Sequence, residues 1–284
     1  MSFLALALAG CVGAGRGAQV STRPPAWDAR TGPLSLSDVA ASLDTVQAIY
    51  VGEHHDRAAD HEAQLRVLQA LHARDPSLAI GMEMFQAPFQ AALDAYVAGD
   101  LDEAGMLDAV EWSERWRMDF ALYRPLLEFA RTNGLRVIAL NARQELTRAI
   151  VREGLEGLSE ALRSGLPELV LDDAAHRAMV AEALAGHGAM DPARMERFYV
   201  AQVVWDETMA ARIAETMAAP EAPRRIVVFA GRMHVERGLG IPRRAARRGV
   251  TSFRVLLPSL PDEVSDDRAA CDVVLPLPDD AQAP

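Results

Sequence analysis

Cysteine is scarce in this sequence, with two residues among 284, Cys11 and Cys271. If Cys11 carries a lipid, as its surroundings predict below, Cys271 has no partner within the chain. A disulfide framework and a thiolate metal site are then both excluded. Any metal bound here must be held by histidine, carboxylate or tyrosine side chains.

Positive charge is also in short supply, because 29 Lys and Arg residues face 40 Asp and Glu residues. The formal net charge is -11 and the isoelectric point is near 5.1. A protein that neutralises nucleic-acid phosphates needs a clustered basic surface, so this balance argues against a nucleic-acid partner. The basic run at 243–248 is expected to form a solvated helix face, with an anionic ligand or a partner surface as the alternative.

The apolar run at the start of the chain is shorter than the roughly 20 residues that span a bilayer. It ends in Leu-Ala-Gly-Cys at 8–11, the pattern of a bacterial lipobox, although the positively charged leading region is missing. We expect residues 1–25 to be a lipoprotein signal and tether, and the protein to be anchored through Cys11 in the bacterial cell envelope, at the outer membrane or its periplasmic face. The alternative is an ordinary buried segment.

Short apolar runs, most of them separated by helical patterns, predict an α/β fold with a mainly parallel sheet flanked by helices. The runs lie at 46–51, 78–84, 136–140, 226–230 and 251–257, with a weaker one at 273–275. The long stretch without a strand signal predicts a helical insertion at 142–218, ending in a helix that begins at Asp191-Pro192. The α/β domain is then expected at 26–141 and 219–275, and a disordered acidic tail at 276–284.

Polar side chains follow four of the predicted strands where each strand ends. Glu53 and His55 follow the first strand, Glu83 lies at the end of the second, Asn141 follows the third and His234 follows the fourth. Ligands of open parallel sheets bind beyond the carboxyl ends of the strands, so these side chains are expected to converge. Two imidazoles and two carboxylates suit a divalent metal or general acid and base chemistry. The alternative for any single histidine is a structural residue with satisfied hydrogen bonds.

Five sequence blocks, at 52–64, 81–86, 140–143, 198–210 and 231–235, resemble the ChaN-like family of iron-regulated, haem-binding lipoproteins. They include G-E-H-H-D, G-M-E-M-F-Q, L-N-A-R, F-Y-V-A-Q-V-V-W-D and G-R-M-H-V. The wider group includes TIKI and TraB proteins and erythromycin esterases, and two of its branches are hydrolytic. The resemblance implies ferric haem as the cofactor.

The resemblance also directs attention to Tyr199 as a haem ligand, because tyrosinate is a hard anion suited to ferric iron. Gln202 and Asp206 fall on the same helix face and are expected to support the site. The alternative is that Tyr199 packs in the core. His187, between two glycines, is a second candidate, although a solvated loop histidine is the simpler interpretation.

Other aromatic and histidine residues receive structural interpretations. Trp112 and Trp116 are four apart, which is typical of core or interface packing. His61 lies on the apolar side of its helix and is expected to pack there, with a supporting role at the site as the alternative.

The function implied by the resemblance is that of a haem-binding lipoprotein in iron or haem uptake or storage. It implies outer-membrane haem or iron transport proteins as partners, and a homodimer is left open. The alternative is a metal-dependent hydrolase in which His55, His234 and one of Glu53 and Glu83 hold a metal, while the other carboxylate acts as base. A partner-binding envelope protein without chemistry is the third reading.

Overall fold

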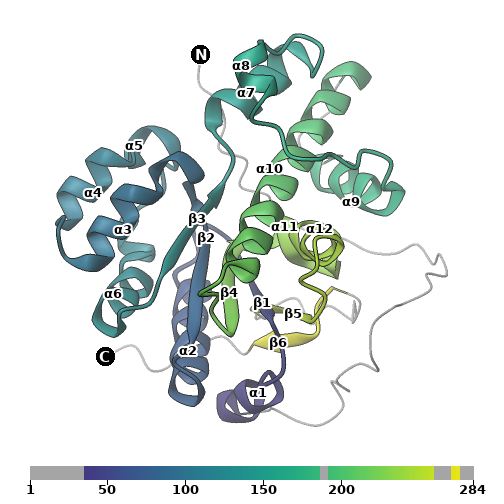
Figure 1. Ribbon diagram of the computed structural model, residues 1–284. Helices are drawn as coiled ribbons and strands as arrows, with labels where there is room; N and C mark the ends of the chain where they lie inside the picture. Colours follow the sequence, from purple (N-terminus) through teal and green to yellow (C-terminus); the bar gives the residue numbers. More distant parts are fainter. Residues whose placement is uncertain (1–34, 186–190, 259–269, 276–284) are drawn as a thin grey trace.

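The computed structural model describes residues 35–185, 191–258 and 270–275. Cys11, His187, the expected tether and the expected tail lie outside these ranges. The strands are β1 (Ala48–Glu53), β2 (Leu78–Gln86), β3 (Val137–Asn141), β4 (Arg225–Gly231), β5 (Phe253–Pro258) and β6 (Val273–Leu275). They form one six-stranded sheet in the order β3-β2-β4-β1-β5-β6, and every neighbouring pair is parallel. The predicted mainly parallel sheet flanked by helices is confirmed (Figure 1).

Helices fill the connections between the strands. They are α1 (Leu36–Ser42), α2 (Ala58–Arg74), α3 (Gln90–Ala98), α4 (Glu103–Ala109), α5 (Trp112–Arg115), α6 (Arg124–Asn133), α7 (Gln144–Glu153), α8 (Glu160–Arg163), α9 (Ala174–Ala185), α10 (Pro192–Ala218), α11 (Arg232–Val235) and α12 (Ile241–Arg247). Within the described ranges, no helix is both long and apolar enough to cross a bilayer.

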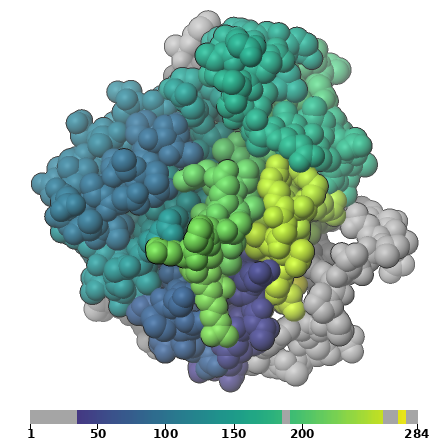
Figure 2. All heavy atoms as spheres, in the orientation of Figure 1, coloured from purple at the N-terminus to yellow at the C-terminus, as the bar shows by residue number. Residues whose placement is uncertain are grey.

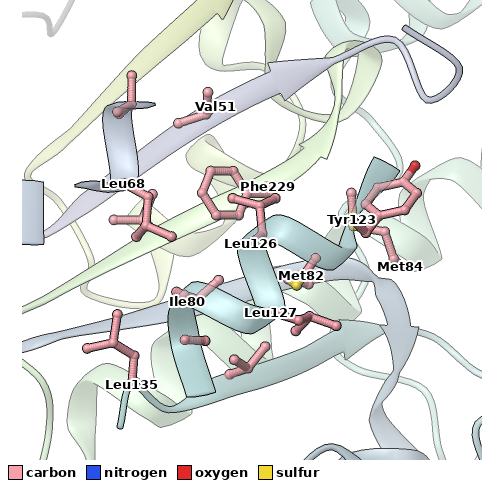
Figure 3. Close-up of a cluster of buried hydrophobic side chains, with 14 of the residues drawn as sticks. Val51, Leu68, Ile80, Met82, Met84, Tyr123, Leu126, Leu127, Leu135 and Phe229 are labelled. Atoms are coloured by element: carbon pink, nitrogen blue, oxygen red, sulfur yellow. The ribbon is translucent and has the colours of Figure 1, made fainter. Parts of the chain in front are cut away.

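The two faces of the sheet bury different sets of side chains, because successive strand residues point to opposite faces. On one face Val51, Ile80 and Phe229 pack with residues of α2 and α6 (Figure 3). On the other face Tyr50 and Val228 pack with residues of α10 and α12. Burial of each large apolar side chain contributes roughly 1.5–3 kcal/mol, so the two layers hold the strand ends in fixed positions.

The long helix α10 begins as its sequence predicts. The Asp191 carboxylate accepts hydrogen bonds from the backbone N–H groups of Ala193 and Arg194, and Pro192 occupies the first turn. Its first half packs on α7, and its second half packs on the sheet through residues such as Ile213. In Figure 2 the green segment that contains α10 lies between the blue segment and the yellow segment that contains α12. The division into an α/β domain and an insertion at 142–218 stays a prediction, with α10 contributing to both cores.

Candidate functional site

The carboxyl ends of β1, β2, β3 and β4 open into a cavity of about 440 Å³. That volume lies within the roughly 300–1,000 Å³ typical of ligand sites. The lining includes the five residues predicted at the strand ends, Glu53, His55, Glu83, Asn141 and His234, together with Gln202 of α10. Apolar walls come from residues of other elements, including Met118, Val180, Leu184 and Phe198. The sheet therefore gathers side chains that are distant in the sequence around one hollow.

The turn after β1 pairs His55 with a carboxylate. His55 Nδ1 lies 2.8 Å from Glu53 Oε1, so this nitrogen carries the ring proton and donates a hydrogen bond to the carboxylate. Glu53 is itself buried and accepts further hydrogen bonds from Gln64 Nε2 at 2.8 Å and from the Tyr123 hydroxyl at 3.2 Å. Burial alone would lower the pKa of His55, but the hydrogen bond to Glu53 and the Glu83 charge raise it. Glu53 thus fixes the orientation of the His55 ring.

The turn after β4 holds His234 between two carboxylates. His234 Nδ1 lies 2.6 Å from Asp206 Oδ1, and His234 Nε2 lies 3.3 Å from Glu83 Oε1. Gln202 places its amide 2.9 Å from the same Nδ1. The other oxygen of Glu83 accepts the backbone N–H of Gly231 at 2.6 Å. Gln202 and Asp206, predicted to support a site, therefore do contact a strand-end histidine.

Charge stabilises this second arrangement. Burial alone would lower the pKa of His234, but the charges of Glu83 and Asp206 raise it to about 10. Burial would raise the pKa of Glu83, yet His234 holds it at about 2. The pKa of Asp206 is lowered for the same reason. At neutral pH the group is an imidazolium between two carboxylates.

The glycines of the two turns serve close packing. Neither Gly52 nor Gly231 has a positive φ, so the backbone conformation does not require glycine at either position. A Cβ on Gly231 would lie 2.8 Å from His55 Cε1, and a Cβ on Gly52 would overlap Leu257. Glycine at 231 therefore lets the ring of the first turn rest against the backbone of the second.

The buried Arg244 contacts His176, and His176 in turn contacts Asp206. Arg244 donates to His176 Nδ1 at 3.1 Å, which leaves the proton of this imidazole on Nε2. That Nε2 lies 3.0 Å from Asp206 Oδ2. Arg244, His176 and Asp206 are all fully or nearly fully buried. The helix face at 243–248 was expected to be solvated. Its arginines instead form ion pairs within the protein, since Arg247 and Arg248 both pair with Glu207.

Tyr199 lies away from the cavity. Its hydroxyl is 3.4 Å from the carbonyl oxygen of Leu171 and 3.5 Å from that of Asp173. The Arg177 guanidinium lies 3.8 Å above its ring. Burial raises the pKa of Tyr199, and Arg177 offsets only part of that rise. Tyrosinate is disfavoured in this conformation, so the assignment of Tyr199 as a haem ligand stays a prediction.

The remaining predicted residues have simpler positions. Asn141 lines the cavity and accepts the backbone N–H of Ala142 at 2.8 Å. His54 lies next to His55 but bonds Asp60, through Nδ1 at 2.9 Å and through its backbone N–H at 2.8 Å. Among the described residues, no group of three or more histidine, cysteine, aspartate and glutamate side chains is arranged to hold a metal ion. The geometry thus gives no support to the expected divalent-metal site.

Several cavity residues were missed or read as structural in the sequence. Trp116 packs against the core, as expected, but it also lines the cavity and contacts the His55 ring edge to face, at 4.8 Å between centroids. Trp205 takes a similar place against His234 at 6.4 Å. His61 is outside the cavity lining and is buried as expected, and its Nδ1 also lies 3.3 Å from Glu53 Oε2, in line with the supporting role that was its alternative. The spacing of Trp112 and Trp116 along their helix did not predict these contacts, because the cavity forms only where α5 and α10 meet the sheet.

Comparison with known proteins places the chain in a family. A family model described as haem-binding uptake, Tiki superfamily, ChaN matches residues 39–245. A structure described as cofacial haem binding to ChaN of Campylobacter jejuni aligns with a TM-score of 0.67 at 16% identity, over 85% of this chain and 92% of that one. An erythromycin esterase in its open conformation aligns with a TM-score of 0.49 at 11% identity, over 80% of this chain and 74% of the esterase.

A curated plant protein is also similar in sequence. Protein RETICULATA-RELATED 5, chloroplastic, of Arabidopsis thaliana is 27% identical over 225 residues, which are 72% of this chain. The chain spans about 30% of the length of that relative.

Proposed function

The chain belongs to the ChaN family of haem-binding uptake proteins in the Tiki superfamily, and from that premise we propose that it binds haem in the cavity at the strand ends. The observation that carries the proposal is that the family match at 39–245 includes every residue that lines the cavity. The Campylobacter jejuni protein, described with cofacial haem binding, has the same fold.

The chemistry of the cavity fits the proposed ligand. Haem is a flat apolar ring with two carboxylate arms, and it needs apolar walls with cationic groups beside them. Trp116, Phe198 and Trp205 supply aromatic walls from two different helical regions. Arginines lie in the same lining, at 115, 117, 148, 232 and 237. The cavity therefore offers both the apolar walls and the cationic groups that haem binding requires.

Haem would supply a ferric iron when bound, and His55 is the residue that we propose would hold it. A metal-bound histidine typically donates its other ring N–H to a carboxylate, which is how His55 Nδ1 meets Glu53. The His55 side chain is 22% exposed and lines the cavity, so part of the ring faces the space in which a ligand would bind. Tyr199 and His187 are the alternatives that the sequence predicted.

The test is a haemin titration of the full chain followed by absorption spectroscopy. We expect saturable binding by the wild type and a changed ferric spectrum in His55→Ala. Tyr199→Phe should leave the spectrum unchanged. Tyr50→Phe is its matched control, since Tyr50 is buried in β1 and its hydroxyl has no hydrogen-bond partner among the described residues. A spectral change in Tyr199→Phe with none in His55→Ala would show that Tyr199, and not His55, is the iron ligand. Absence of saturable binding by the wild type would overturn the function.

Trp116→Ala tests the location of the ligand. Loss of an aromatic wall should weaken haemin binding by about tenfold, corresponding to about 1.4 kcal/mol. Phe129→Ala is the matched control, because the Phe129 ring packs on His72 and not on the cavity. Equal effects of both substitutions would contradict a ligand bound against Trp116.

We also propose the cellular setting that the sequence suggests, a lipoprotein anchored through Cys11 that delivers or stores haem or iron at the bacterial envelope. The L-A-G-C pattern supports it. Cys11→Ala should abolish incorporation of labelled fatty acid in bacteria that express the full chain. Incorporation that persists in this variant would contradict the anchor. Outer-membrane transport proteins and a homodimer remain the proposed partners.

A second candidate function rests on the strand-end cluster itself. The pairing of His55 with Glu53 and the buried charges of Glu83 and His234 suit ester hydrolysis by acid and base chemistry. Water would add to the carbonyl carbon while His55 Nε2 accepts its proton. The ester C–O bond would then break and the proton would pass to the leaving alcohol. Turnover of an ester panel by the wild type and not by His55→Ala would support this activity, and no turnover by the wild type would reject it.

A further inference from the structure

The short helix beside one wall of the cavity is bounded by strained residues. α5 is four residues long and is followed directly by Trp116, whose ring contacts the His55 ring at 4.8 Å between centroids. Among the described residues, three that are not glycine have a positive φ, and two of them lie on either side of this helix, Glu111 at 53° and Arg117 at 70°. Such conformations cost free energy and persist where surrounding contacts impose them, most often at functional sites. The segment 111–117 therefore needs contacts that hold it in place.

Arg115 supplies such contacts, because its guanidinium reaches residues outside α5. Its Nη1 lies 2.9 Å from Glu145 Oε1 of α7 and donates to Gln86 Oε1, at the end of β2, at 3.0 Å. Its Nε donates to Glu111 Oε2 at 2.7 Å. The guanidinium also lies 4.8 Å from the centre of the Phe89 ring. Arg115 therefore joins α5 to both β2 and α7.

The same group of contacts fixes the start of α7, which forms another part of the cavity wall. Gln86 Oε1 accepts the backbone N–H of Gln144, the first residue of α7, at 3.0 Å. Thr147 and Val151 of this helix line the cavity. The guanidinium of Arg115 is thus engaged by two carboxylates and one amide oxygen, and these interactions connect two walls of the cavity.

We propose that Arg115 is a positioning residue that holds Trp116 against His55. The inference rests on the proposed haem-binding function and names the residue that keeps one wall of that site in place. Trp112 and Tyr123 contact the Trp116 ring at 6.4 and 6.2 Å between centroids, and both belong to the apolar core. Arg115 precedes Trp116 in the chain, so its contacts fix the backbone from which the Trp116 ring projects.

A double-mutant cycle of haemin affinity tests this role. Arg115→Met should weaken haemin binding by about fivefold in the otherwise wild-type chain, because the Trp116 wall is no longer fixed. In a Trp116→Ala background the same substitution should have no further effect, since the wall on which it acts is absent. An equal loss in both backgrounds would overturn the inference, because Arg115 would then act on the ligand or on the fold independently of Trp116.

Arg124→Met is the matched control for Arg115→Met. The Arg124 guanidinium also pairs with a carboxylate, that of Glu103 at 2.8 Å, and lies over a phenyl ring, that of Phe120 at 5.5 Å. Arg124 is outside the cavity lining, so the haemin affinity of this variant should equal that of the wild type. A loss as large as that in Arg115→Met would overturn the inference, since the effect would not depend on contact with the cavity wall.

A readout without haemin reports on the wall itself. Fluorine NMR of protein labelled with 5-fluorotryptophan resolves the four tryptophans of the chain, and Trp116→Phe identifies the Trp116 resonance. This resonance should shift or broaden in Arg115→Met and stay in place in Arg124→Met. If Arg115→Met does not fold, Glu145→Gln should shift the same resonance, since it weakens only the contact with α7. An unchanged Trp116 resonance in the folded variant would overturn the inference.

Failure of the proposed function gives a different result. Wild-type haemin affinity in Arg115→Met would overturn the inference and leave the proposed function intact. No saturable binding of haemin by the wild type would overturn the proposed function, and with it the role in haem binding that the inference gives to Arg115.

Discussion

The turn after β1 and the turn after β4 each place a histidine three residues after a glycine, and both histidines line the same cavity. His55 is paired with one carboxylate that lies two residues away and keeps 22% of its side chain exposed. His234 lies between carboxylates from β2 and α10 and keeps 9% exposed. One turn therefore leaves part of its histidine ring exposed at the cavity, while the other holds its histidine between buried carboxylates that join helix and sheet.

The difference shows that the spacing positions a histidine but does not decide its role. The role depends on partners that approach from elsewhere in the chain. For His234 the decisive partner is Asp206, which Arg244 and His176 support from behind. For His55 it is Glu53, which Gln64 and Tyr123 support.

The largest expected effect comes from breaking the second turn. Asp206→Asn should lower the free energy of unfolding by about 3 kcal/mol, because it leaves charges buried without their partner. Urea denaturation at pH 7 measures the change. Glu153→Gln, at an exposed ion pair, is the control and should change stability by less than about 0.5 kcal/mol. A loss for Asp206→Asn as small as that of the control would contradict the buried charge pair.

The pH dependence of stability should also separate the two turns. The pKa of His234 is raised to about 10 in the folded protein, so its contribution is complete below about 6.5, its unfolded value. It should decline as pH rises above that value and be lost when pH passes about 10. Unfolding midpoints of the wild type and His234→Asn, measured between pH 6 and 10.5, should therefore converge. A constant difference over this range would show that His234 is not held charged.

A methyl group at Gly231 should disturb both turns at once. Gly231→Ala would place Cβ 2.8 Å from His55 Cε1 and force that ring to move, at a cost of about 2 kcal/mol. It should also weaken haemin binding if His55 is the ligand. Gly165→Ala is the control, since its Cβ would meet only Leu162 O at 3.6 Å. Unchanged stability and haemin affinity in Gly231→Ala would mean that the His55 ring can adopt another position without loss of either.

The smallest of the expected effects belongs to the first turn. Glu53→Gln should cost about 1 kcal/mol, because the amide oxygen can still accept the hydrogen bond from His55 while the one from Gln64 Nε2 is lost. Glu53→Gln should reduce the affinity for haemin more strongly than it reduces stability, since the neutral amide no longer increases the basicity of His55. A stability loss equal to that of Asp206→Asn would remove the distinction between the two turns.

Much of the fold followed from patterns within single segments. The apolar runs predicted the strands to within two residues at their ends, and Asp191-Pro192 predicted the start of α10. The strand ends predicted which residues would meet, because parallel strands place their carboxyl ends together. Contacts made between segments could not be predicted in this way.

The missed residues show the limit. Trp116 reaches His55 only because α5 folds over the end of β1. Tyr199 lies on the same helix as Gln202 and Asp206, yet its hydroxyl meets backbone carbonyls that precede α9. Helical spacing gives the face of a residue on its own helix, but it does not give the neighbour that covers this face.

The central claim is that haem binds in the cavity at the strand ends. A crystal structure of the full chain grown with haemin tests it most directly. The account predicts ring density against Trp116 and Trp205 and iron within bonding distance of His55. Haem bound through Tyr199, with the cavity containing only solvent, would contradict it.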